Sequence, residues 1–337
     1  MQAKVTKWCE GERIMLADVV PLDTPISLLV EPSSACNFKC FYCPHGLMAE
    51  NRSKYGNLNK VMDFPIFEKL IEDSKRFPKR IKAINFSRFG EPLLNKRLPE
   101  MINLAKRNDA CEVTKVITNG SVLTPELNLK LISAGLDVLR ISVQGLTNQQ
   151  ISDTCGFNLD FDNFVSNIRH FYNNRGRCKL FIKIIDEIIK GSEDVFFKIF
   201  GDICDEISIE HLIDADDYMA LEDKGKKRLT NMMCEIIDNV DVCSSPFYSL
   251  NICANGNISP CCSDLEEKIV FGNVMTDSIF DIWDSKKMNA FRVMQLKGCR
   301  YTHQVCRVCT GPTYAKQTRD NIDSCRERLL EYYKDKL

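Results

Sequence analysis

Between residues 26 and 210, short apolar runs rich in β-branched residues alternate with longer amphipathic segments. The short runs predict six strands, at residues 26–31, 81–87, 113–118, 138–143, 180–185 and 206–210. The longer segments predict helices near residues 64–77, 96–108, 125–134, 161–174 and 192–203, with start signals such as Thr124 before Pro125-Glu126. Strands joined through helices form parallel sheets with right-handed crossovers. Six such units predict an α/β fold, either a partial (β/α)6 TIM-like barrel or a flat doubly wound sheet.

The chain changes character after this repeat. Residues 214–242 are rich in charge and predict a solvated connector. Residues 243–310 are rich in Cys, Gly and Asn, and Asn255-Gly256 predicts a hairpin turn. The expected organisation is an N-terminal extension at 1–25, a barrel at 26–213, a connector at 214–242, a small Cys-rich domain at 243–310 and a C-terminal helix within 311–337.

Composition and charge exclude several classes of protein. The 337 residues are 44% hydrophobic and 27% charged, which is ordinary for a globular chain. A net charge of −1 offers no basic field for nucleic acid or an anionic membrane. No apolar run approaches the roughly 20 residues of a membrane helix, and the N-terminus lacks a secretory pattern. We therefore expect a cytoplasmic protein that binds neither nucleic acid nor membrane.

The 17 cysteines are the unusual feature of the composition. In a large cytosolic chain they indicate metal or cluster ligation, or buried apolar thiols, rather than disulfides. Three of them, Cys36, Cys40 and Cys43, follow the first predicted strand directly. Three thiolates at this spacing can hold three irons of a [4Fe–4S] cluster and leave the fourth iron open to a small molecule. The alternative is a structural zinc site, for which His45 is the candidate fourth ligand.

This CxxxCxxC motif, with an aromatic residue before its last cysteine, resembles the radical S-adenosylmethionine (SAM) superfamily. Three further motifs at predicted strand ends support the resemblance: Phe89-Gly90-Glu91-Pro92, Thr118-Asn119-Gly120 and Ser142-Val143-Gln144-Gly145. They resemble the Gly-Gly-Glu-Pro element, the turn after the third strand and the Ser-x-Asp-Gly element of that family, with Phe89 and Gln144 as departures.

The resemblance implies a cofactor, a reductant and a set of binding residues. SAM would bind the open iron, and a flavodoxin- or ferredoxin-type reductant would supply one electron. A 5′-deoxyadenosyl radical would then abstract hydrogen from the substrate. The residues implied to contact SAM are Tyr42, Gly90, Glu91, Asn119, Ser142, Gln144 and Lys183.

A second group of cysteines lies in the C-terminal region. Its spacing, with Gly256, Gly272-Asn273 and Ile282-Trp283, resembles the SPASM/twitch extension of radical SAM proteins. The further cysteines of a full SPASM domain are missing, because Ala315 and Arg319 stand at the candidate positions. The resemblance therefore implies one auxiliary [4Fe–4S] cluster, held by Cys243, Cys261, Cys306 and Cys309. A four-cysteine zinc site is the alternative, and Cys262, Cys253 or Cys299 could substitute as a ligand.

An auxiliary cluster with four protein ligands could accept an electron from a substrate radical and so complete the oxidation of an alcohol. Peptide maturases of this family usually carry an extra N-terminal domain, whereas the barrel is expected to begin at residue 26. We therefore expect a small substrate such as a sugar, a cyclitol or a nucleotide-linked sugar. The alternative is a maturase that modifies a peptide or a sulfatase, and epimerisation or elimination also stay open. Candidate catalytic residues at strand ends are Arg88, Glu210 and His211.

Overall fold

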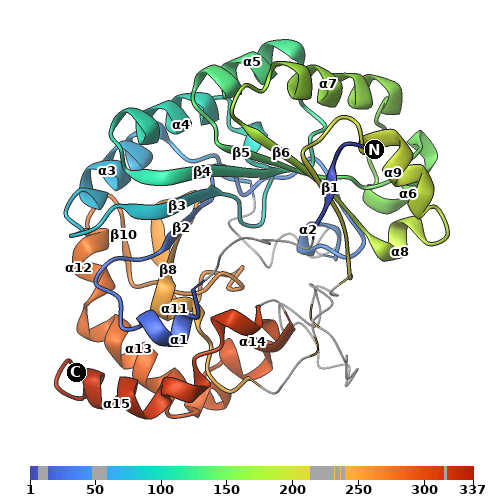
Figure 1. Ribbon diagram of the computed structural model, residues 1–337. Helices are drawn as coiled ribbons and strands as arrows, with labels where there is room; N and C mark the ends of the chain where they lie inside the picture. The colour runs from blue at the N-terminus through green and yellow to red at the C-terminus, as the bar shows by residue number, and fades with distance from the viewer. Residues whose placement is uncertain (7–13, 48–58, 213–230, 232–235, 237–239, 315–316) are drawn as a thin grey trace.

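The computed structural model of the protein describes residues 1–6, 14–47, 59–212, 231, 236, 240–314 and 317–337 (Figure 1). Most of the expected connector 214–242 lies outside these residues. The described strands form one ten-stranded sheet in the order β1-β7-β6-β5-β4-β3-β2-β8-β9-β10. The strands of this sheet are β1 Lys4–Val5, β2 Ser27–Val30, β3 Ile81–Phe86, β4 Cys111–Thr118, β5 Val138–Ser142, β6 Lys179–Ile185, β7 Glu206–Glu210, β8 Ser249–Ile252, β9 Asn257–Ser259 and β10 Gly272–Asn273.

The six predicted strands are β2 to β7, which pair in chain order and run parallel. The five predicted helices are also present, at α3 Phe64–Ser74, α4 Leu98–Arg107, α5 Pro125–Ser133, α7 Phe161–Asn174 and α9 Glu193–Phe200. Figure 1 shows these helices in an arc along one face of the curved sheet. A doubly wound sheet would carry helices on both faces, so the fold is a partial (β/α)6 barrel.

Side-chain alternation along the strands separates an apolar outer face from a polar inner face. On β5, Leu139 and Ile141 are fully buried in the main core under the helices. Arg140 and Ser142 alternate with them, so they point to the opposite, inner face of the barrel. The carboxyl ends of parallel strands meet at one edge, where the motif loops therefore gather.

Three helices in the barrel region were not predicted: α2 Pro44–Leu47, α6 Asn148–Cys155 and α8 Asp186–Ile189. The sequence of α6 is mostly polar, which hides its period. Its start is nevertheless marked, because the hydroxyl of Thr147 accepts a hydrogen bond from the Gln150 N–H at 3.1 Å.

The C-terminal region extends the barrel sheet. Strand β8 pairs in parallel with β2 and antiparallel with β9, so the predicted hairpin at Asn255-Gly256 is confirmed. The region also contains α11 Ser245–Tyr248, α12 Ile279–Trp283, α13 Lys286–Leu296, α14 Gly311–Tyr314 and α15 Arg326–Lys334. Helix α1, Leu16–Val19, packs with α13 and α15 in a second core, and Arg328 donates to the backbone carbonyls of Ala17 and Val20 at 2.6 Å. None of the helices in the described part of the chain is long and apolar enough to cross a membrane.

Candidate active site

The loop of the first cysteine motif is held by backbone hydrogen bonds on both sides. Within the loop, the Cys43 N–H donates to the Cys40 carbonyl at 3.0 Å. From outside, the C-terminal carbonyls of α6 accept from the loop: Cys155 from Lys39 at 2.8 Å and Thr154 from Phe41 at 3.1 Å. The position of this loop therefore depends on α6, an element that lies more than 100 residues further along the chain.

Among the three cysteines of this loop, Cys40 is buried and Cys36 and Cys43 are half-buried. Burial raises the pKa of Cys36 to about 12 and that of Cys43 to about 11. The pKa of Cys40 is also raised, first by a hydrogen bond with the thiol of Cys155 and then by burial. A buried set of sulfur donors suits iron, which would take the place of the thiol protons. These residues fit a [4Fe–4S] cluster.

The Gly-Glu element packs directly on the cysteine loop. A Cβ atom at Gly90 would overlap the carbonyl of Ser33 and lie 2.7 Å from that of Ala35. The next residue, Glu91, donates its backbone N–H to the Ala35 carbonyl at 2.8 Å. Only glycine permits this close approach, which fixes the end of β3 against the residues that lead into Cys36.

The carboxylate of Glu91 is buried and joins two strand ends. One oxygen accepts from the Thr118 hydroxyl at 2.6 Å and from the Leu93 N–H at 2.9 Å, and the other accepts from the Asn119 N–H at 2.7 Å. Burial raises the pKa of Glu91 to about 7. The carboxylate therefore organises the ends of β3 and β4, although the resemblance implied that Glu91 would contact SAM.

Asn119 and Gln144 link the other motif loops to the cysteine loop. The side-chain amide of Asn119 donates to Asn37 at 3.0 Å and lies 3.9 Å from the sulfur of Cys36. The Tyr42 hydroxyl donates to the side-chain oxygen of Gln144, whose amide donates to the Ser142 carbonyl at 3.2 Å. The implied SAM residues of β4 and β5 thus gather around the first cysteine motif.

An ion-paired group of three charges lies on the inner face of the barrel. The two oxygens of Glu210 accept from Arg140 and from Lys183, and the carboxylate is only 4% exposed. Burial lowers the pKa of Lys183, and the neighbouring Arg140 acts in the same direction against the pull of Glu210. Because a cation engages each of its oxygens, Glu210 is poorly suited to act as a base.

His211 lies at the rim of the barrel. Its Nδ1 faces the carboxylate of Asp186, the first residue of α8, and the imidazole is 45% exposed. A carboxylate on one ring nitrogen orients the imidazole and leaves the other nitrogen for a substrate. Asp186 was missed in the sequence, although it directly follows the predicted strand 180–185.

Arg88 is buried in an ion pair, not open to a substrate. Its guanidinium lies 3.5 Å from Glu31 and donates to the Asp264 carbonyl at 2.6 Å, and both charged side chains are 2% exposed. Glu31 in turn accepts from the Ala254 N–H at 3.1 Å. Arg88 therefore joins the barrel to the C-terminal region, a place that does not favour its expected contact with the substrate.

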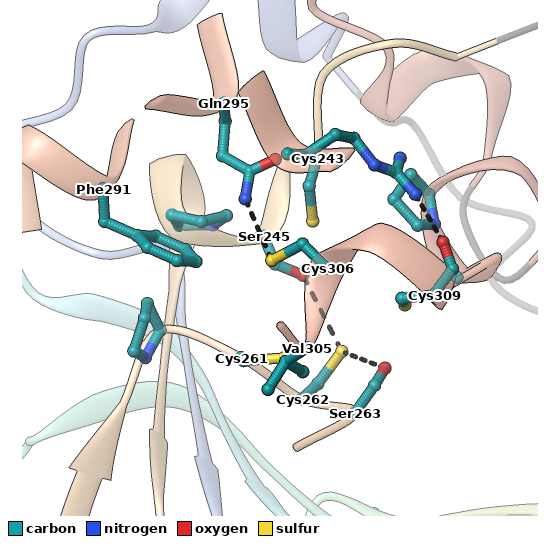
Figure 2. Close-up of a pocket in the computed structure, with 15 residues that line it drawn as sticks. Cys243, Ser245, Cys261, Cys262, Ser263, Phe291, Gln295, Val305, Cys306 and Cys309 are labelled. Atoms are coloured by element: carbon teal, nitrogen blue, oxygen red, sulfur yellow. Dashed lines mark hydrogen bonds between the residues drawn. The ribbon is translucent and has the colours of Figure 1, made fainter. Parts of the chain in front are cut away.

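The second cysteine group surrounds one pocket, shown in Figure 2. Gln295 donates to the sulfur of Cys306 at 3.5 Å, and the guanidinium of Arg300 donates to the Cys309 carbonyl. Burial raises the pKa of Cys306 to about 11 and that of Cys309 to about 12. Apolar side chains such as Phe291 complete the wall. The thiols that line the pocket are Cys243, Cys261, Cys262, Cys306 and Cys309.

The pocket thus holds one more thiol than a cluster with four ligands needs. Cys262 lines it beside Cys261, and its sulfur lies 3.8 Å from the Ser245 hydroxyl. The other two candidate substitutes lie elsewhere: Cys253 is fully buried at the end of β8, and Cys299 is exposed. Within the described residues, no three His, Cys, Asp or Glu side chains surround a single point as one metal ion would require. The set of sulfur donors suits an iron–sulfur cluster.

Comparisons with known proteins support an iron–sulfur assignment for both cysteine groups. A family model described as the radical SAM superfamily matches residues 30–192, and one described as an iron–sulfur cluster-binding domain, SPASM, matches residues 243–310. The chain belongs to the radical SAM superfamily. As a radical SAM enzyme it uses SAM and a [4Fe–4S] cluster, and its SPASM domain carries auxiliary iron–sulfur chemistry in place of zinc.

One curated relative and two solved structures cover most of this radical SAM chain. The S-adenosyl-L-methionine-dependent 2-deoxy-scyllo-inosamine dehydrogenase of Niallia circulans is 24% identical over 87% of this chain and 95% of its own. The crystal structure of BtrN in complex with AdoMet and 2-DOIA aligns with a TM-score of 0.54 at 22% identity, over 85% of this chain and 92% of that one. Streptococcus suis SuiB bound to precursor peptide SuiA aligns with a TM-score of 0.59 at 16% identity, over 88% and 76%. These structural likenesses establish the fold.

Proposed function

We propose that this radical SAM enzyme is a dehydrogenase that oxidises one alcohol of a small cyclitol or sugar. The observation that carries the proposal is the second thiol pocket, which is connected to the barrel through β8 beside β2. A second cluster at that place can accept the electron that an oxidation must release. The dehydrogenase of Niallia circulans, similar over nearly its whole length, supports a cyclitol as the substrate class.

In this proposal Cys36, Cys40 and Cys43 hold the catalytic cluster, and the auxiliary cluster is held by Cys243, Cys261, Cys306 and Cys309. When bound, the two clusters and SAM supply a 5′-deoxyadenosyl radical and a one-electron acceptor. The substrate carbon loses a hydrogen atom to that radical. The hydroxyl then loses its proton to a base and the substrate radical loses one electron, which gives a carbonyl. A flavodoxin- or ferredoxin-type partner supplies the starting electron and removes the later one.

The chain's own residues position SAM in this scheme. The carboxylate of Glu91 is occupied by three donors and its N–H by the Ala35 carbonyl, so Glu91 offers SAM its backbone carbonyl and Gly90 offers its backbone. Tyr42 and Gln144 are already hydrogen-bonded to each other beside the cysteine loop, and they close the adenine side. Further polar contacts come from Asn119, Ser142 and Lys183.

His211 is the base that we assign to the alcohol proton. Its imidazole is oriented by Asp186 at the rim of the barrel, whereas Glu210 and Arg88 are committed to buried ion pairs. The Asp186 carboxylate engages Nδ1 of the imidazole, which leaves Nε2 to face the substrate hydroxyl.

The experiment is an anaerobic assay of the reconstituted enzyme with 2-deoxy-scyllo-inosamine and related cyclitols. We expect one carbonyl product for each 5′-deoxyadenosine, and His211→Asn should reduce product by about 100-fold or more while SAM cleavage persists. A failure of every cyclitol and sugar, with turnover of a peptide, would instead favour the maturase alternative. That alternative is supported by the peptide-bound structure of SuiB, which is similar to this chain in fold.

A further inference from the structure

The auxiliary pocket contains a buried positive charge. Arg300 lines the pocket with the thiols and is 4% exposed. It lies at the start of the short turn Cys299–Thr302, directly before the Cys306–Val308 turn of the CxxC motif. Its guanidinium donates a hydrogen bond to the backbone carbonyl of Cys309. The guanidinium is therefore held at the wall of the pocket by the same loop that supplies two of the thiols.

Arg300 has no carboxylate partner among the described residues. Arg88 and Arg140, two other buried arginines near the sites, are paired with Glu31 and Glu210, and Arg292 donates instead to three oxygen atoms of Pro246, Trp283 and Asn289. The Nε atom of Arg300 is also buried without a hydrogen-bond partner within the described chain. A buried guanidinium without a counter-charge is costly, since removal of a charge from water is compensated only by pairing. Such a group indicates that an anion belongs in the pocket.

The guanidinium of Arg300 lies close enough to two of the thiols, those of Cys306 and Cys309, for its charge to act on them, and it is hydrogen-bonded to the backbone of Cys309. The same charge would favour each thiolate once iron is bound. Four thiolates around a [4Fe–4S] cluster give the site a net negative charge, and an accepted electron makes it more negative. The pocket therefore contains a cation in the place where such an anion needs one.

We propose that Arg300 is the counter-charge of the auxiliary cluster and that it raises the reduction potential of that cluster. This inference rests on the proposed function, in which the auxiliary cluster takes one electron from the substrate radical. A nearby buried cation stabilises the reduced, more negative state more than the oxidised state, so reduction becomes easier. Arg300 is a positioning residue in this account, because it acts on the cluster and not on the substrate.

The chain offers a matched control within the same motif. Arg307 lies between Cys306 and Cys309 but is exposed, so water screens its charge. Arg300→Gln removes the buried charge, and Arg300→Lys keeps a positive charge while it loses the planar fork. Arg307→Gln removes an exposed charge from the same loop.

The test is an electron paramagnetic resonance redox titration of the reconstituted holoenzyme and these three variants. Added SAM changes the signal of the catalytic cluster, which binds it, and so identifies the auxiliary signal as the one left unchanged. We expect Arg300→Gln to shift the auxiliary potential to lower values, Arg300→Lys to stay near the wild type and Arg307→Gln to leave the potential unchanged. Loss of the auxiliary cluster in Arg300→Gln with retention in Arg300→Lys would also support a counter-charge.

Two results would overturn the inference about Arg300 and leave the proposed function standing. One is an unchanged potential in Arg300→Gln, and the other is an equal shift or an equal loss of cluster in Arg300→Gln and Arg300→Lys. The second result would mean that the hydrogen bond to the Cys309 backbone matters and the charge does not. A wild-type protein that binds only four irons, about half of the content expected for two clusters, would instead overturn the proposed function together with the inference.

Discussion

A single buried carboxyl group, that of Glu91, connects the SAM motif to the strand that follows it. The carboxylate accepts three hydrogen bonds, from the backbone N–H groups of Leu93 and Asn119 and from the Thr118 hydroxyl. Burial nevertheless dominates and raises the pKa of Glu91 from its usual 4.5 to about 7. The residue therefore carries a proton in the folded protein at pH values where an unfolded chain has lost it.

This shift predicts a pH dependence of stability. Between pH 4.5 and about 7 the native state binds a proton that the unfolded state does not, so the contribution of Glu91, complete below pH 4.5, is lost as the pH rises through about 7. The loss amounts to roughly 3 kcal/mol. Urea unfolding of the cluster-free protein at pH 5 and pH 7.5 should show this fall, and Glu91→Gln should lack it. Parallel pH profiles for the two proteins would contradict the assignment.

Gly90 predicts a steric effect at the same motif. Gly90→Ala should destabilise the fold by roughly 2 kcal/mol, because the new methyl group meets the backbone of Ser33 and Ala35, which cannot rotate away. It should also lower the iron bound after reconstitution, since the strain falls on the residues before Cys36. Gly176→Ala is the control: no atom of the described residues beyond its chain neighbours lies within 4 Å of the new methyl group, and the cost is limited to about 1 kcal/mol for the positive φ. Equal iron content in the two variants would contradict this account.

At the level of single residues, the sequence predicted the motif positions better than their partners. Cys36, Cys40, Glu91 and Asn119 were identified because their spacing forms a pattern. Cys155, which hydrogen-bonds Cys40, has no such spacing, because the contact depends on where α6 ends. Lys183 shows why orientation is hard to predict. The inner face of an open barrel is as polar as a solvent-facing surface, so alternation cannot distinguish the two environments.

Helix α6 is an element whose stability should control the first cluster site. Its last carbonyls hold Lys39 and Phe41 of the cysteine loop, and its first turn is capped by Thr147. Thr147→Ala should cost about 1 kcal/mol of stability and speed the loss of iron to a chelator. Thr124→Ala, which removes the same kind of cap from α5, should cost a similar amount and leave the rate of iron loss unchanged. Equal rates in both variants would show that α6 does not hold the loop.

The hairpin of β8 and β9 raises a choice of ligand that the sequence left open. Cys261 and Cys262 follow it in succession, and both line the auxiliary pocket. The glycine spacing favours Cys261, so Cys261→Ala should lose about four irons and Cys262→Ala should lose none. The reverse result, measured as iron and sulfide per chain, would assign the ligand to Cys262.

Elements of the barrel were predictable where a strand is buried and apolar. Strands β2 to β7 were found because each carries a β-branched run with a motif or turn at its end. Helix α6 was missed because Ile151 is the only large aliphatic residue in it. Strand β1 was missed because two residues carry no period, and its pairing with β7 depends on the completed sheet.

Across the whole molecule, one continuous sheet supports both cysteine sites. Strand β2 leads into the catalytic cysteine loop and pairs with β3 on one side and with β8 on the other. The buried Arg88–Glu31 pair closes the junction between the barrel and the C-terminal region. The auxiliary site is therefore fixed relative to the catalytic site by backbone pairing. This arrangement suits an electron acceptor that must stay close to one bound substrate.

The most direct test of the central claim is iron and sulfide per chain after anaerobic reconstitution, measured together with 5′-deoxyadenosine formed on reduction with dithionite. We predict about eight irons and SAM cleavage in the wild type. Cys40→Ala should abolish cleavage, and Cys306→Ala should retain some cleavage while it loses about four irons. Full SAM cleavage in Cys40→Ala, or no iron and no cleavage in a folded wild-type sample, would contradict the account.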